Sequence, residues 1–190
     1  ADTVGLVLTI PNLISFVRLI LIPVFLWLLL GRDNPFAAGW LFGFIASTDW
    51  VDGYLARRLD QVSEVGKFLD PLADRLAVFA ALVGGLISGY VPAGFAWAVV
   101  AREVLIGGGA IVVGLLGHTK LEVRRLGKLA TLLVYSSLAW FLVGTEWDWV
   151  KVAAWIAGIP GLILYYAVGI QYFSDAIAAI RRSRAGAEPE

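Results

Sequence analysis

Residues 49–74, DWVDGYLARRLDQVSEVGKFLDPLAD, place six carboxylates between two long apolar stretches. The whole chain of 190 residues is 59% hydrophobic and only 16% charged, whereas soluble domains usually carry about a quarter charged residues. Its apolar residues come in long blocks and not in amphipathic stripes. The composition therefore predicts an all-α membrane protein, in which an acidic segment requires a functional explanation.

Six apolar blocks of roughly 20 residues have the length of a membrane-spanning helix. They lie near residues 12–30, 36–56, 68–88, 92–116, 126–145 and 149–173. Because the segments between them are short, we expect a single domain over residues 1–190, built as one bundle of six transmembrane helices and ending in a frayed tail, RRSRAGAEPE. The first block has no basic leader or small-residue cleavage site, so we expect it to be retained.

Basic residues are divided unequally between the two ends of the predicted helices. The alternate loops carry only Arg32 and Lys151, whereas the other loops and the tail carry Arg57, Arg58, Lys67, Arg75, Lys120, Arg124, Arg125, Lys128, Arg181, Arg182 and Arg184. The positive-inside bias places residues 49–74 and both termini on the cytoplasmic side of the inner membrane. Trp40, Trp147 and Trp149 then mark the opposite interface. A net charge of zero gives no reason to expect a nucleic acid partner.

Small residues at four-residue spacing predict close helix packing at Gly39 with Gly43 and at Gly85 with Gly89. A glycine and proline segment, residues 158–161, predicts a bend in the last helix, which membrane helices tolerate. The chain has no cysteine, so disulfides and thiolate metal sites are excluded.

The acidic residues of 49–74 follow helical spacing. Asp49 and Asp52 share one side of their helix, and Asp70 and Asp74 share one side of the next, at about 100° per residue. Consecutive helices joined by a short loop run antiparallel, so the two acidic sides can face each other. The spacing predicts a pocket of four carboxylates that opens to the cytoplasm.

Four uncompensated carboxylates in one pocket would force protonation, and hard divalent cations remove this problem. Oxygen ligands without thiolate or imidazole favour Mg²⁺ or Mn²⁺, which commonly work with phosphates. Arg57 adds a planar donor for a phosphate. The alternative is that the acids are interfacial and pair with basic neighbours, and we expect such a solvated loop position for Asp60 and Glu64.

The segment also resembles a known signature, D-x2-D-G-x2-A-R-x8-G-x3-D-x3-D, which is typical of the CDP-alcohol phosphotransferase (class I phosphatidyltransferase) family. All eight fixed positions are met, by Asp49, Asp52, Gly53, Ala56, Arg57, Gly66, Asp70 and Asp74. The resemblance extends over the chain, since members of this family have six transmembrane helices and short loops.

This resemblance implies an enzyme of phospholipid biosynthesis that transfers a phosphatidyl group from CDP-diacylglycerol to an alcohol and releases CMP, an activity of the EC 2.7.8 type. It implies two Mg²⁺ or Mn²⁺ ions held by Asp49, Asp52, Asp70 and Asp74, with Asp74 also acting as the general base. The implied CDP site comprises Asp49, Asp52, Gly53, Ala56, Arg57, Gly66 and Asp70. A homodimer is implied as well.

Two further segments bear on the acceptor alcohol. TIPNLISFVRLILIP at the start of the chain and LDPLADR resemble the bacterial phosphatidylglycerophosphate synthase branch, including its cardiolipin synthase relatives. We therefore expect glycerol 3-phosphate as the acceptor, with phosphatidylglycerol, which would give cardiolipin, as the alternative. Asn12 and Arg18 are expected to line the donor site, although Asn12 is also a suitable helix cap.

A phosphorylated acceptor requires a cationic pocket. The candidates are Arg102, Arg124, Arg125, Lys128 and Arg181. Two alternatives stay open, because Arg124 and Arg125 suit an ordinary positive-inside loop and Arg102 can form a salt bridge with Glu103. Thr131 stands near the position where phosphatidylglycerophosphate synthases often carry a second lysine.

Two other classes of protein also use acidic membrane helices. A prenyltransferase combines aspartates, Mg²⁺ and a lipid diphosphate, but it needs more helices than 190 residues supply. A divalent-cation carrier would line a path through the membrane with polar residues on both halves of the helices. Few polar residues occur on the outer halves, so the sequence favours a site that opens on one side only.

Overall fold

The computed structural model describes residues 10–59, 64–115 and 125–185, and every regular element in these ranges is a helix. The elements are α1 (Ile10–Leu26), the π-helical turn η1 (Trp27–Gly31), α2 (Pro35–Leu59), α3 (Glu64–Ser88), α4 (Ala93–Leu115), α5 (Arg125–Val143) and α6 (Asp148–Ala185). The all-α prediction is confirmed, and its six helices lie at the expected places in the chain.

Three helical segments within the described ranges are long and apolar enough to cross a membrane. They are Leu13–Gly31, Leu126–Val143 and Asp148–Gln171, and the apolar segment Pro35–Thr48 is shorter. Apolar side chains such as Ile20, Ile156 and Ile163 are exposed along these segments. A lipid environment accounts for this exposure, so the structure is consistent with a membrane protein, while six complete spans remain a prediction.

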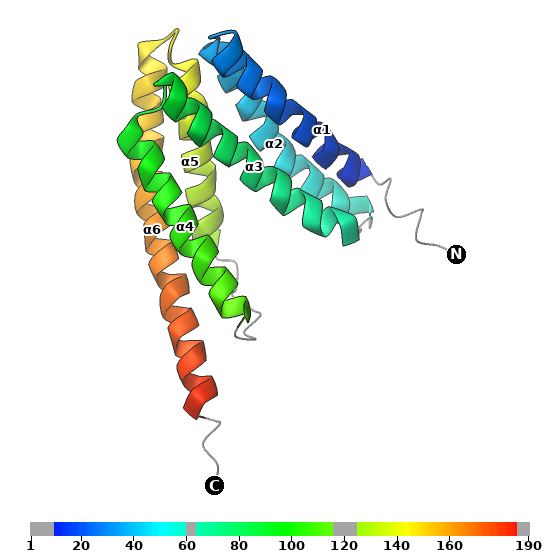
Figure 1. The fold of residues 1–190 in the computed structure, drawn as a ribbon, viewed down its shortest axis with the longest axis vertical. Helices are drawn as coiled ribbons and strands as arrows, with labels where there is room; N and C mark the ends of the chain where they lie inside the picture. The colour runs from blue at the N-terminus through cyan, green and yellow to red at the C-terminus, as the bar shows by residue number, and fades with distance from the viewer. Residues whose placement is uncertain (1–9, 60–63, 116–124, 186–190) are drawn as a thin grey trace, which may run out of the picture.

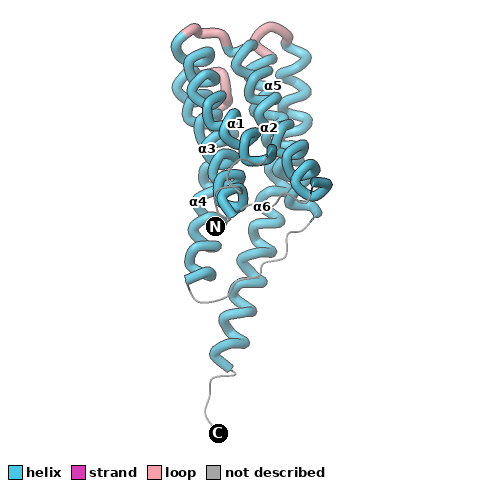
Figure 2. The backbone as a smooth tube through the Cα atoms, turned by 90° about the vertical axis from the view of Figure 1, so that its right-hand side faces the viewer, coloured by secondary structure: helices cyan, strands magenta, loops and turns pink. Residues whose placement is uncertain are grey.

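The helices form two groups that meet at one end of the molecule. Figure 1 shows α1, α2 and α3 on one side, with α4, α5 and α6 on the other. The short loops at 32–34, 89–92 and 144–147 gather at the end where the groups meet (Figure 2). The groups diverge from there, so the ends of α2 and α3 that carry the motif lie at the far end, away from these loops (Figure 1).

Glycines set the close approach between neighbouring helices, both between the two groups and within one of them. A Cβ atom on Gly39 of α2 would lie 2.8 Å from the backbone nitrogen of Val143 in α5, whereas one on Gly43 would meet only the Ala139 Cβ at 3.8 Å. A Cβ on Gly161 of α6 would lie 2.9 Å from the Leu133 Cβ in α5. The predicted close packing is therefore confirmed at Gly39, while Gly43 makes an ordinary contact.

The loops at the meeting end are fixed by polar contacts. Asn34 caps α2, because its side-chain oxygen accepts a hydrogen bond of 3.0 Å from the Ala37 backbone N–H. The Tyr90 hydroxyl donates to the Asp33 carboxylate at 2.8 Å and so joins the α1–α2 and α3–α4 connections. Gly89 adopts a positive φ of 75°, which ends α3 with little strain.

Two predictions about helix ends were wrong. Glu64 is the first residue of α3 and not part of a loop, since a carboxylate at a helix N-terminus is stabilised by the helix dipole. The tail segment RRSRA is helical up to Ala185, because alanine and arginine are strong helix formers. With 38 residues, α6 extends well beyond the roughly 20 that span a bilayer. Asp60 and residues 186–190 lie outside the described ranges.

Candidate active site

The motif occupies parts of two consecutive helices. Asp49 and Asp52, with Gly53, Ala56 and Arg57, lie in the second half of α2, and Gly66, Asp70 and Asp74 lie in the first half of α3. The helical placement of both acidic pairs agrees with the prediction from their spacing. Of the four aspartates, Asp74 is the one whose side chain the structure describes, so the predicted four-carboxylate cluster remains a prediction.

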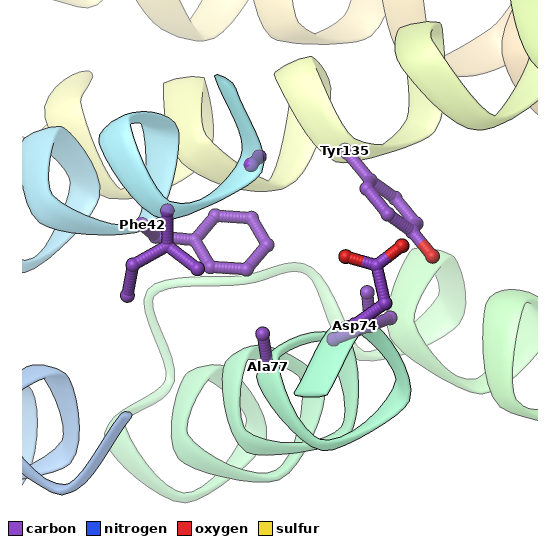
Figure 3. Close-up of a pocket in the computed structure, with 7 residues that line it drawn as sticks. Phe42, Asp74, Ala77 and Tyr135 are labelled. Atoms are coloured by element: carbon purple, nitrogen blue, oxygen red, sulfur yellow. The ribbon is translucent and has the colours of Figure 1, made fainter. Parts of the chain in front are cut away.

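Asp74 lines a small pocket between three helices. The other lining residues are Phe42, Ile45 and Ala46 of α2, Ala77 and Val78 of α3, and Tyr135 of α5. Figure 3 shows the Asp74 carboxylate and the Tyr135 side chain turned toward each other across this pocket. The Asp74 side chain keeps 33% of its exposure, so it combines access from outside with largely apolar neighbours. Such a carboxylate is a reasonable proton acceptor for a hydroxyl group that enters the pocket.

The carboxylate is also held by an arginine from outside the motif. Nη1 of Arg18 in α1 donates to Oδ1 of Asp74 at 3.0 Å, and the Arg18 side chain is 1% exposed. Sequence reasoning named Arg18 as a donor-site residue but did not pair it with Asp74. The signal was present, because a charged residue inside an apolar span requires a partner of opposite charge.

A second hollow lies on the α1 side of Arg18. This groove of about 220 Å³ is lined by Leu13, Ile14, Val17, Arg18 and Leu21 of α1 and by Phe44 and Thr48 of α2. Leu13, Val17 and Phe44 are exposed, so the groove opens on the apolar surface of the molecule. Its last lining residue in α2, Thr48, directly precedes Asp49 of the motif. The groove thus connects the apolar surface with the start of the motif.

Arg102, a candidate for phosphate binding, belongs to a compact polar cluster between α4 and α6. Its Nη1 lies 3.0 Å from Oε1 of Glu103, and its guanidinium carbon lies 3.6 Å from the ring centre of Tyr165. The Tyr165 hydroxyl donates to the same Glu103 oxygen. The salt bridge with Glu103, one of the two alternatives for Arg102, is therefore present. Nε of Arg102 is buried and makes no hydrogen bond within the described residues.

The other cationic candidates are spread over two helices. Lys128 is exposed in the first turns of α5, which begins at Arg125, and Arg181 lies in the last part of α6. Arg124 falls outside the described residues. Sequence reasoning gave no role to Tyr135 or Tyr165. A tyrosine hydroxyl inside an apolar helix requires a hydrogen-bond partner, and this signal could have singled both out.

Comparison with known proteins identifies the class of enzyme. The family model described as CDP-alcohol phosphatidyltransferase matches residues 8–168, which include the complete motif and also Arg18. The chain therefore belongs to the CDP-alcohol phosphatidyltransferase family, a family of membrane-bound transferases. The family membership predicted from residues 49–74 is confirmed.

Relatives with two kinds of name share most of the chain. The CMP-forming cardiolipin synthase of Streptomyces coelicolor is 35% identical over 87% of this chain and 81% of its own. The CDP-diacylglycerol–glycerol-3-phosphate 3-phosphatidyltransferase of Bacillus subtilis is 34% identical over 91% of this chain and 97% of its own. The Escherichia coli enzyme of the same name is 35% identical over 89% and 95%. Because the chain is about equally similar to both groups of relatives, overall sequence similarity does not distinguish the two acceptors.

Proposed function

We propose that this chain transfers the phosphatidyl group of CDP-diacylglycerol to glycerol 3-phosphate, which yields phosphatidylglycerophosphate and CMP. The observation that carries the proposal is the complete motif on α2 and α3, with its last aspartate, Asp74, in a pocket between α2, α3 and α5. The names of the Bacillus subtilis and Escherichia coli relatives support glycerol 3-phosphate as the acceptor. The Streptomyces coelicolor relative supports phosphatidylglycerol as a second candidate.

The acidic residues of the motif fit two divalent cations. Asp49 and Asp52 of α2 and Asp70 and Asp74 of α3 offer only carboxylate oxygens, and their helical spacing allows each pair to face the other. We assign the metal ligands to these four residues. Bound Mg²⁺ or Mn²⁺ supplies charge neutralisation for the donor diphosphate and for the departing CMP.

In the proposed reaction Asp74 accepts the proton of the acceptor hydroxyl. The hydroxyl oxygen forms a bond to the phosphorus of the phosphatidyl group, and the bond from that phosphorus to the oxygen that leaves with CMP breaks. Arg57 provides a planar guanidinium for a phosphate of the donor. Gly53, Ala56 and Gly66 are small enough for the nucleotide to approach the helix backbone. Positioning of this kind accounts for most of the catalysis in phosphoryl transfer.

The groove between α1 and α2 supports a lipid donor. Its walls are apolar, and exposed Leu13, Val17 and Phe44 place its opening where hydrocarbon chains surround a membrane protein. Its other end at Thr48 adjoins the motif. We therefore assign one acyl chain of the donor to this groove, with the diphosphate toward Asp49.

For the acceptor phosphate we propose the cationic set Arg102, Arg124, Arg125, Lys128 and Arg181. The unused donor at Nε of Arg102 supports a role in binding an anion, because a buried N–H without a partner is costly. Glu103 opposes this role by neutralising the same guanidinium. Phosphatidylglycerol as acceptor makes less use of these cations, since its phosphodiester carries a single charge.

We further propose six membrane spans, with the motif and both termini at the cytoplasmic face of the inner membrane, and a homodimer. The distribution of basic loop residues supports the orientation. Because the chain has no cysteine, single cysteines introduced beside Glu146 and Lys128 can be tested with an impermeant maleimide in intact cells. We expect labelling at the first position only, and cross-linking in native membranes tests the dimer.

The decisive experiment incubates purified protein in lipid vesicles with CDP-diacylglycerol, Mg²⁺ and one acceptor at a time, followed by mass spectrometry of the products. We expect phosphatidylglycerophosphate and CMP with glycerol 3-phosphate, and loss of both after chelation with EDTA. Cardiolipin formation from phosphatidylglycerol alone supports the second candidate. Metal flux into vesicles without CMP release contradicts both and supports a cation carrier.

A further inference from the structure

The side chain of Arg18, a residue inside α1, is almost completely buried, although it carries a charge. Its side chain is 1% exposed, and among the side chains that the structure describes the other polar ones with comparable burial are the uncharged Ser15 and Ser137. Its partner Asp74 keeps one third of its exposure. A guanidinium is costly to bury, so its position needs a benefit that the apolar packing of α1 does not provide.

The geometry shows what the guanidinium does. It lies between the groove on the α1–α2 surface and the pocket that contains Asp74, and it contacts the carboxylate at Oδ1. Arginine is always charged and its donors are fixed in a plane, so a 3.0 Å bond to one oxygen restrains rotation of the carboxylate. The restraint comes from α1, whereas the motif lies on α2 and α3.

We propose that Arg18 is a positioning residue, whose buried guanidinium fixes the Asp74 carboxylate in the orientation that accepts the proton of the acceptor hydroxyl. The inference rests on the proposed function. A base that rotates freely is aligned with the hydroxyl for only part of the time, and loss of alignment lowers the rate of the chemical step. Arg18 itself contacts neither the hydroxyl nor the phosphorus in this arrangement. Its role differs from lining the donor site, which predicts an effect on donor binding.

The test compares Arg18→Gln, Arg18→Lys and the control Arg32→Gln in vesicles. Arg32 is an exposed arginine that stacks on Trp27 at the opposite end of the first helical segment. We expect Arg18→Gln to lower kcat by roughly 10- to 100-fold, as misplaced catalytic groups do, while KM for both substrates is retained. Donor affinity, measured by calorimetry without acceptor, should change far less than kcat, because six other residues also line the groove. Arg18→Lys should restore part of kcat, and Arg32→Gln should match the wild type.

Several results would overturn the role of Arg18. One is a wild-type kcat in Arg18→Gln, and another is an effect confined to donor KM and donor affinity. A third is failure of both Arg18 variants to fold, which would indicate a purely structural role. If only Arg18→Gln fails to fold, Arg18→Lys decides: a lower kcat at an unchanged melting temperature supports positioning, and a wild-type kcat contradicts it. Absence of CMP release from the wild type with every acceptor refutes the proposed function itself.

Discussion

Arg18 in α1 and Asp74 in α3 are 56 positions apart in the chain, and their side chains meet at 3.0 Å. A residue of α1, outside the motif on α2 and α3, therefore contacts the last aspartate of that motif. Because Arg18 also borders the groove on the lipid-facing surface, one side chain adjoins both the proposed donor chain and the proposed base. This relationship makes α1 part of the proposed active site.

Replacement of Asp74 by asparagine should abolish turnover. General base catalysis contributes about 10²- to 10⁴-fold, so we expect CMP release to fall by at least about 10²-fold. Donor binding should largely persist, because the other three motif aspartates remain. The same change at exposed Asp148, which pairs with Lys151 at the other end of the molecule, provides the control. Normal CMP release by Asp74→Asn would exclude Asp74 as the base.

Filling the groove should weaken binding of long-chain donors. Val17 lines the groove, whereas the exposed Ile20 on the same helix does not line it. We expect Val17→Trp to raise KM for a long-chain CDP-diacylglycerol about tenfold, since excluding two methylenes forfeits about 1.6 kcal/mol. A short-chain donor should be unaffected, and Ile20→Trp should behave as the wild type. The assignment of an acyl chain to the groove would be contradicted if Val17→Trp and Ile20→Trp changed the donor KM equally. It would also be contradicted if either variant changed the KM of the long-chain and short-chain donors equally.

The two glycines of α2 should differ in their tolerance of alanine. A Cβ at Gly39 would overlap backbone atoms of α5 at 2.8 and 2.9 Å, and these atoms cannot move without shifting the helix. We expect Gly39→Ala to reduce the free energy of unfolding by about 1–3 kcal/mol. Gly43→Ala meets only a contact at 3.8 Å and should be neutral or stabilising by up to about 1 kcal/mol. Thermal unfolding in detergent measures both, and equal melting temperatures would show that α2 and α5 pack less closely.

The hydrogen bond from Tyr90 to Asp33, which links loops 89–92 and 32–34, should stabilise the fold in a pH-dependent way. The hydrogen bond to Asp33 is the main cause of the raised pKa of Tyr90, and burial and the negative charge add to it. The protonated phenol therefore stabilises the fold fully below its usual pKa of 10.0, and this contribution is lost as the pH rises through the higher folded value. We expect the difference in melting temperature between wild type and Tyr90→Phe to be constant from neutral pH to about 10 and to shrink above it. Asp33→Asn should remove this pH dependence, and a constant difference at all pH values would argue against the coupling.

Arg102 provides a test of the acceptor. If its guanidinium binds the phosphate of glycerol 3-phosphate, Arg102→Gln should raise KM for this acceptor about 10- to 100-fold, the equivalent of one charged hydrogen bond. KM for CDP-diacylglycerol should be unchanged. Lys151→Gln, at an exposed position on α6, serves as the control. An unchanged acceptor KM would leave Arg102 as part of a structural cluster in which Tyr165 of α6 contacts Arg102 and Glu103 of α4.

Much of the architecture follows from local properties of the chain. Apolar blocks of sufficient length form helices, because in a membrane every backbone polar group must be satisfied within its own segment. Helical spacing likewise predicts Asp70 and Asp74 on one side of α3. The ends of helices were less predictable, as Glu64 and Ala185 show, since capping and intrinsic helix propensity extend a helix beyond its apolar block.

The family, the helical class and the motif residues could all be identified from the amino-acid sequence, because they depend on composition and on short, regular spacing. Three contacts could be seen only in the folded chain: Arg18 with Asp74, Arg102 with Glu103 and Tyr165, and the tight approach of α5 at Gly39 instead of Gly43. Each of these brings together residues from different helices. Their proximity arises from the packing of whole helices, which no local pattern specifies.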